Sequence, residues 1–153
     1  MSLRLYVVFK PDDGLTREDS MLRINERFPN TASISDDCIN LDGKWPGFLT
    51  QSDNYNNVPC FPYWSFYFWC YWDAVLENMD FRRYVMTLCE LLGADEWWYI
   101  EEASIDLYDE LSTGEYENIL ENSIGIENFE IPSFFPNGEH HFFKDSSQRV
   151  KSL

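Results

Sequence analysis

The sequence lacks basic residues over much of its length. No Lys or Arg occurs between residues 84 and 143, whereas 14 Asp or Glu do, and the formal net charge of the chain is −16. A strongly negative region repels the phosphate backbone, which excludes nucleic acid as a direct ligand of this part of the protein. The same field keeps a protein soluble and speeds its encounter with cations or basic proteins.

Histidine is nearly absent, and cysteine is too widely spaced for a metal site. The only histidines, His140 and His141, are adjacent, so their side chains diverge on a strand or on a helix. The four cysteines, at positions 38, 60, 70 and 89, form no C-x-x-C pair and have no nearby histidine. We therefore expect no metal and no other cofactor, and we interpret the cysteines as reduced thiols, with a disulfide or a reactive thiol as the alternative.

Motifs for phosphate, dinucleotide or calcium binding are also missing. The sequence has no Gly-rich phosphate loop, no G-x-S-x-G and no dinucleotide fingerprint. The nearest pattern to a divalent-ion loop consists of Asp106, Asp109 and Glu110 before a Ser-Thr-Gly sequence, and its spacing does not match that of known calcium loops.

No segment is long and apolar enough to cross a membrane. The longest uncharged stretch, residues 54–72, contains Pro59 and Pro62 and is polar in its first half. The N-terminal residues do not form a secretion signal. We therefore expect a cytoplasmic protein that contacts neither membrane nor nucleic acid.

The composition and patterning predict a single compact α+β domain, with a mixed sheet and packed helices. A chain of 153 residues that is 44% hydrophobic can bury a core of its own. We expect this domain to span residues 1–144 and a polar, flexible tail to occupy residues 145–153. The strand, helix, strand order from 63 to 101 indicates a crossover unit. Residue patterns predict strands at 3–9, 34–41, 63–72, 96–101 and 129–131, and residues 43–63 are expected to be mostly loop. Helical spacing predicts three helices. The first covers 17–28 and is capped by Thr16, the second covers 80–92, is capped by Asp80 and is ended by Gly93, and the third lies near 115–122 with Thr113 as its cap.

Residues 63–72 form an unusual aromatic run, Tyr-Trp-Ser-Phe-Tyr-Phe-Trp-Cys-Tyr-Trp. Because aromatic residues favour pleated surfaces and no charge interrupts the run, we interpret it as a strand buried on both faces. The alternative is an exposed aromatic platform that stacks a sugar, a base or a partner side chain.

The acidic segment 95–130 is the main functional signal. It is either a solubilising face or a docking surface for a Lys- or Arg-rich protein, since carboxylates around aromatic anchors combine fast association with a buried contact. No catalytic residues are assigned. The residues predicted to bind the partner are Glu101, Glu102, Asp106, Tyr108, Asp109, Glu110, Glu115, Tyr116 and Glu117.

The chain is small and acidic, is expected to be α+β, and opens with a strand and a helix. A later predicted helix leads into the sequence Leu-Gly-Ala-Asp-Glu-Trp-Trp-Tyr-Ile-Glu at 92–101. In these features it resembles the immunity proteins that bacteria pair with secreted polymorphic or contact-dependent toxins. The resemblance implies a non-enzymatic inhibitor that binds a basic nuclease toxin and blocks its site by mimicking phosphate charge. It carries over no binding residues, and the aromatic run at 63–72 departs from the pattern.

Two other functions remain open from the sequence. One is a small carbohydrate-active enzyme, in which carboxylate pairs such as Glu101-Glu102 or Asp109-Glu110 act over an aromatic cleft. The other is a structural adaptor subunit.

Overall fold

The first strand, β1 (Leu5–Phe9), lies in the middle of the sheet and is buried along its whole length. It pairs antiparallel with β5 (Trp64–Phe68) on one side and with β6 (Glu96–Glu101) on the other. The structure, a computed structural model, describes residues 5–36, 38–51, 63–70, 78–101, 113–128 and 142–153. Since β5 and β6 both run antiparallel to β1, they are parallel to each other, and β5, α3 and β6 form the predicted crossover.

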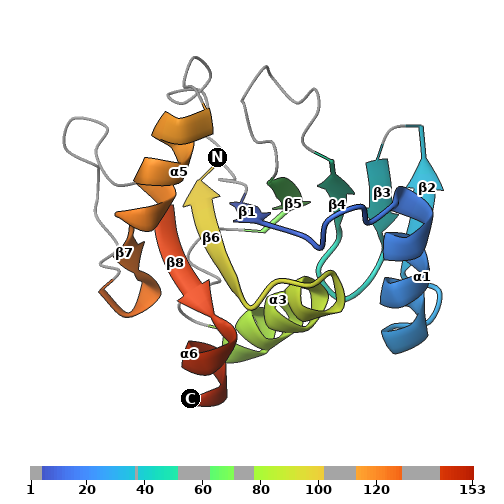
Figure 1. Cartoon of the computed structure of the whole chain (residues 1–153). Helices are drawn as coiled ribbons and strands as arrows, with labels where there is room; N and C mark the ends of the chain where they lie inside the picture. Colours follow the sequence, from blue (N-terminus) through green and yellow to red (C-terminus); the bar gives the residue numbers. More distant parts are fainter. Residues whose placement is uncertain (1–4, 37, 52–62, 71–77, 102–112, 129–141) are drawn as a thin grey trace.

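Around this centre, eight strands of the described chain form one mixed sheet in the order β2-β3-β4-β5-β1-β6-β8-β7 (Figure 1). Neighbours are antiparallel except β7 and β8, which are parallel. The α+β prediction, with a mixed sheet and packed helices, is confirmed. The other strands are β2 (Ala32–Ser35), β3 (Cys38–Leu41), β4 (Gly47–Thr50), β7 (Ile124–Gly125) and β8 (Phe142–Ser146).

Local capping explains where the two longest described helices begin. The Thr16 side chain accepts a hydrogen bond from the Asp19 amide at 3.1 Å, as predicted. For the next helix the cap is Asn78 instead of the predicted Asp80, which lies in the first turn. The helix ends before Gly93, whose φ of +94° favours glycine. The helices are α1 (Arg17–Arg27), α3 (Met79–Leu91), α5 (Thr113–Glu121) and α6 (Ser147–Lys151), with a 3₁₀ turn, η2, at Ile126–Asn128.

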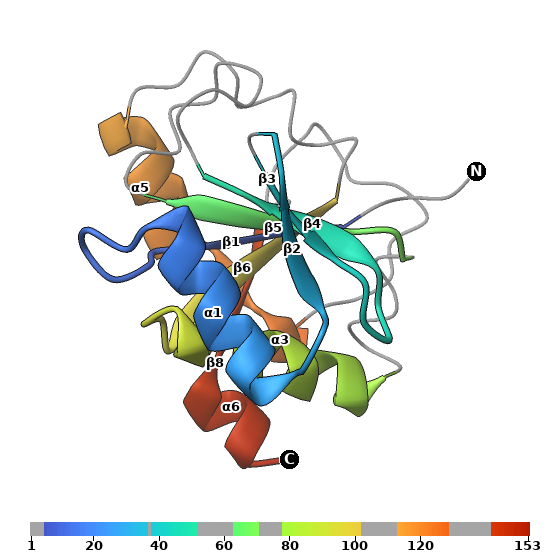
Figure 2. The same ribbon diagram turned by 90° about the vertical axis from the view of Figure 1, so that its right-hand side faces the viewer.

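The two faces of the sheet carry separate apolar clusters. Figures 1 and 2 show α1, α3 and α6 on one side of the sheet and α5 on the other. Alternation along β1 sends Val7 to the first side and Val8 to the second. The central strands are therefore covered on both faces. The first cluster joins Leu5, Val7, Phe9, Phe66, Phe68, Trp97 and Tyr99 to Ile24, Leu88 and Val150, and the second joins Tyr6, Val8, Tyr67, Trp98 and Ile100 to Tyr116 and Leu120.

The described part of the aromatic run lies mainly in the core. Phe66, Tyr67 and Phe68 are buried, and the rings of Phe66 and Phe9 stack with centroids 4.9 Å apart. Trp69, just beyond the strand, is 49% exposed. The core interpretation is thus confirmed for 66–68, and residues 71 and 72 lie outside the described ranges.

One prediction about strands is wrong. Residues 34–41 do not form one strand, because the chain reverses at Asp36, which has a φ of +48°, and β2 then pairs with β3 as a hairpin. Within residues 43–63, which were expected to be mostly loop, residues 47–50 form β4, a strand too short to give a clear alternation, and residues 52–62 lie outside the described ranges. The strand predicted at 129–131 lies outside the described residues.

The expectation of a flexible tail at 145–153 is also wrong. Asp145 belongs to β8, which pairs with β6, and α6 follows directly. The Ser146 hydroxyl caps α6 by accepting a hydrogen bond from the Arg149 amide at 3.2 Å, and Val150 enters the first core cluster. The composition of this segment is polar, and the contacts that order it are made with residues distant in the sequence, so its own sequence does not reveal that it is folded.

The buried run gives a stability prediction. Phe66→Ala should lower the free energy of unfolding by about 3–5 kcal/mol, because it leaves a cavity beside Phe9 and Phe68 on the face of the sheet that α1, α3 and α6 cover. Trp69→Ala, which truncates a half-exposed ring, is the control and should cost clearly less. Urea denaturation of both variants measures the difference, and equal losses would show that Phe66 is not a core residue.

Candidate functional site

A buried ion pair fixes β8, and with it the surface beside β6. Arg82 of α3 donates to Asp145 twice, from Nε to Oδ2 and from Nη2 to Oδ1, each at 2.8 Å, and the Asp145 side chain is fully buried. The Tyr99 hydroxyl adds a hydrogen bond to Oδ2 at 3.4 Å, and Trp97 donates to that hydroxyl at 2.9 Å. Burial acts to lower the pKa of Arg82, but the hydrogen bond and negative charge of Asp145 outweigh it and raise the pKa.

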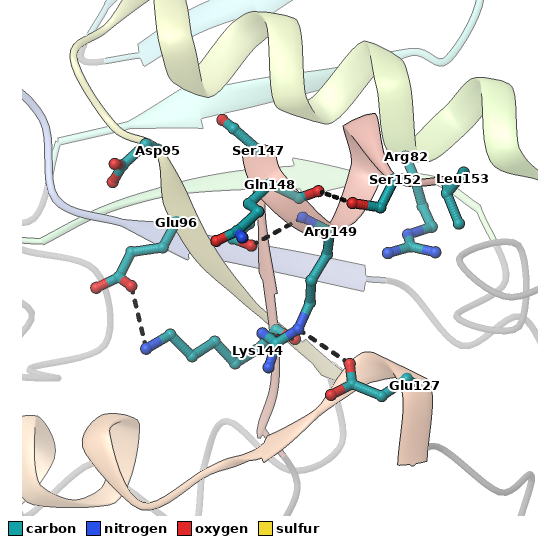
Figure 3. Close-up of a pocket in the computed structure, with 11 residues that line it drawn as sticks. Arg82, Asp95, Glu96, Glu127, Lys144, Ser147, Gln148, Arg149, Ser152 and Leu153 are labelled. Carbon is teal, nitrogen blue, oxygen red and sulfur yellow. Dashed lines mark hydrogen bonds and ion pairs between the residues drawn. The ribbon is translucent and has the colours of Figure 1, made fainter.

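Above this pair lies a groove of about 750 Å³ that α6 borders, called here the α6 groove (Figure 3). Two ion pairs line it: Lys144 Nζ lies 3.0 Å from a Glu96 oxygen, and Arg149 Nε lies 3.0 Å from a Glu127 oxygen. Both pairs are partly exposed, so water screens them and they contribute little stability. Because these charges compensate each other, the groove presents little net field to a ligand.

The lining of the α6 groove shares Asp95, Glu96 and Lys144 with a second cavity of about 320 Å³, the Tyr63 cavity. Tyr63 and Trp98 also line this cavity, and their rings meet edge to face with centroids 6.2 Å apart. Burial raises the pKa of Tyr63, and the negative charges of Glu117, Glu121 and Glu96 raise it further. The Tyr63 cavity therefore combines an aromatic wall with surrounding carboxylates.

The charges around the Tyr63 cavity do not balance. Asp95, Glu117 and Glu121 form no ion pair with any described residue, whereas Lys144 is held by Glu96. Lys10 is the other cation that lines the cavity. The surface formed by Asp95, Glu96, Glu117 and Glu121, called here the acidic face, thus carries more negative than positive charge.

The structure places only part of the predicted binding surface. Glu115 and Glu117 lie on α5, Glu115 exposed and Glu117 half-buried. Tyr116 was expected as a surface anchor, which is wrong: its side chain is 0% exposed and packs against Tyr63 and Phe142, with centroids 5.9 and 5.8 Å away. Glu101 ends β6, and its side chain is not described. Glu102, Asp106, Tyr108, Asp109 and Glu110 lie outside the described residues.

Asp95, Glu96, Glu121 and Tyr63 were not singled out from the sequence. The three acids lie within the acidic segment 95–130, so the composition indicated an acidic region that contains them but did not distinguish them from its other acids. Tyr63 had been assigned to the aromatic run alone. Its position beside Trp98 and Tyr116 depends on how α5 packs on the sheet, which no local pattern contains.

Comparisons identify no relative: no protein-family model matches the chain, and neither a curated protein nor a solved structure gives a significant match. In the ranges that the structure covers, no three His, Cys, Asp or Glu side chains are grouped to hold a metal ion. The covered helices also include none with the length and apolar character needed to cross a bilayer.

The buried ion pair can be tested by removing its charge on one side. Asp145→Asn should lower the free energy of unfolding by about 3–5 kcal/mol, because it leaves Arg82 buried without a counter-charge. Glu127→Gln, which breaks the exposed pair with Arg149, is the control and should change stability by less than about 1 kcal/mol. Chemical denaturation measures both, and similar losses in the two variants would contradict the role assigned to the pair.

Proposed function

We propose that the protein binds a Lys- or Arg-rich protein partner through the acidic face. The observation that carries the proposal is that three carboxylates lie around an aromatic cavity of about 320 Å³ and form no ion pair with any residue that the structure describes, namely Asp95, Glu117 and Glu121. Uncompensated carboxylates give electrostatic attraction, and a cavity with aromatic edges gives one partner side chain a place to be buried.

The acidic face already holds one cation in the way proposed for the partner. Lys144 Nζ lies 5.6 Å from the ring centroid of Trp98 and 3.0 Å from a Glu96 oxygen. A ring and a carboxylate together stabilise an ammonium or guanidinium group more than either does alone. A Lys or Arg of the partner that enters the Tyr63 cavity would meet Tyr63 and Glu121 in a comparable arrangement.

The charge of the surrounding chain supports the same class of partner. Between residues 84 and 143 the sequence has 14 acidic and no basic residues, and these residues include β6 and α5. Such a field extends about 8–10 Å into physiological salt and steers a basic protein toward the acidic face before contact. Binding of this kind needs no catalytic group and no cofactor.

The specific form of the proposal is an inhibitor of the immunity type, which blocks a basic nuclease toxin by occupying its phosphate-binding site with carboxylates. The resemblance noted in the sequence and the acidic face support this form. Affinity capture with the protein as bait, from the cells that produce it, would supply the partner for the binding measurements below. The partner should then lose nuclease activity when the two proteins are mixed in equal amounts.

Charge reversal tests the surface. The triple variant Asp95→Lys, Glu117→Lys, Glu121→Lys should weaken the captured complex by at least about 100-fold, since close interfacial charge pairs contribute about 1.5 kcal/mol or more each. The fold should survive, because Asp95 and Glu121 are exposed, Glu117 is only half-buried, and none of the three forms an ion pair with a described residue that the change would break. Calorimetry or surface plasmon resonance measures the affinity, and a thermal melt checks the fold.

A matched control carries the same change in net charge elsewhere. Asp13, Glu26 and Asp42 are exposed and form no ion pair within the described chain, so their triple reversal to Lys should leave most of the affinity intact. Undiminished binding by the first triple variant would exclude the acidic face. Equal weakening by both would mean that only net charge matters.

A further inference from the structure

A separate cavity of about 340 Å³ lies between the C-terminal end of α1, the first half of α3 and residues 43–45; it is called here the Trp45 cavity. Its walls are aromatic: the ring of Tyr84 lies 5.4 Å from that of Trp45 and 5.2 Å from that of Phe28, between centroids. This volume falls in the range of about 300–1,000 Å³ that small-molecule sites occupy. The Trp45 cavity shares no lining residue with the acidic face.

Two cations that line the Trp45 cavity have no carboxylate partner among the described residues. The guanidinium carbon of Arg27 lies 4.8 Å from the Phe28 ring centroid, and Lys44 Nζ lies 4.7 Å from that of Trp45. Neither forms an ion pair with any residue that the structure describes. A third cation, Arg83, is paired with Asp80 at 3.2 Å, so this cavity carries a positive excess.

That excess is unusual in this chain, where acidic residues outnumber basic ones 27 to 11. Most described cations form an ion pair with a carboxylate, namely Arg23, Arg82, Arg83, Lys144, Arg149 and Lys151. The described cations that have none are Lys10, Arg17, Arg27 and Lys44, and two of these four line one aromatic cavity. The chain thus keeps positive charge uncompensated at the Trp45 cavity, although carboxylates are abundant elsewhere.

The wall of the Trp45 cavity also holds a polar group without a partner. The Tyr84 side chain is 8% exposed, and its hydroxyl makes no hydrogen bond with any described residue. Burial raises the pKa of Tyr84 to about 12, so the hydroxyl keeps its proton and remains a donor. Gly43, which also lines the cavity, lies against this hydroxyl: a Cβ there would come within 3.1 Å of it. The hydroxyl has almost no accessible surface, so the ring of Tyr84, and not its hydroxyl, is the part of this side chain that a ligand in the cavity can contact.

We propose that the Trp45 cavity binds a small organic anion, a flat ring that carries a carboxylate or a phosphate group. The ring packs against Trp45 and Tyr84, and the anionic group lies at Arg27 and Lys44. Aromatic walls favour a ring through stacked and edge-to-face contacts, and the two cations select negative charge. This site is independent of the acidic face, because its residues are different and its charge is opposite.

Phenyl phosphate and benzoate are suitable probes of this site, with benzyl alcohol as the neutral counterpart and inorganic phosphate as the ringless one. Calorimetry on the whole protein should give a dissociation constant below about 1 mM for at least one of the two aromatic anions. The double variant Arg27→Gln, Lys44→Gln should bind it at least about 10-fold more weakly, because hydrogen bonds to charged groups are lost. Lys151→Gln removes an exposed cation outside the cavity and should leave the affinity unchanged.

Several results would overturn the proposal. These are no binding of either aromatic anion, equal affinity in the double variant and the wild-type protein, and equal affinity for benzyl alcohol and benzoate. Inorganic phosphate that binds as tightly as phenyl phosphate would remove the role of the aromatic walls. Tyr84→Phe is a further control: it keeps the ring and removes a buried hydroxyl that has no partner in the described structure, so it should leave both the melting temperature and the binding of the anion unchanged.

Discussion

The ion pair between Arg82 and Asp145 is the interaction on which the C-terminal half of the structure depends. It joins α3 to β8 beneath the sheet, and β8 in turn pairs with β6, the neighbour of the central strand. A buried charge is tolerated only when its hydrogen-bonding capacity is satisfied, and Asp145 also accepts from the Ser146 amide and the Tyr99 hydroxyl. With β8 fixed in this way, Lys144 lies beside Glu96, and the edge of the acidic face is defined.

The same chain presents two surfaces of opposite charge, each built on aromatic rings. Around Tyr63, carboxylates outnumber the cations, whereas Arg27 and Lys44 line the Trp45 cavity and pair with no carboxylate in the described part of the chain. The rings come from different elements: Trp98 lies on β6 and Tyr63 directly precedes β5, whereas Tyr84 lies on α3, Phe28 ends α1 and Trp45 precedes β4. The regional distribution of charge, more than its total, therefore determines what each surface can bind.

Local signals were sufficient to predict α1, α3 and β6. Thr16 and Gly93 mark helix ends through hydrogen bonding and backbone conformation. The strand predicted at 96–101 is β6, in which Trp97 and Trp98 enter the clusters on opposite faces. Asp145 was misjudged because its partner is 63 residues away in the sequence, so a buried carboxylate looked like part of a polar tail. For Tyr116, helical spacing predicted the helix but could not predict that the sheet would bury this side chain. The acids of the site could not be selected, because the whole segment is acidic.

The most direct test of the acidic face is the association rate of the wild-type protein with its captured partner as a function of salt. Between about 50 and 500 mM salt the Debye length falls from roughly 14 Å to under about 5 Å, so steering by Asp95, Glu117 and Glu121 is screened. The account predicts that the association rate falls by about 10-fold or more over this range while the dissociation rate changes much less. An association rate that does not depend on salt would contradict it.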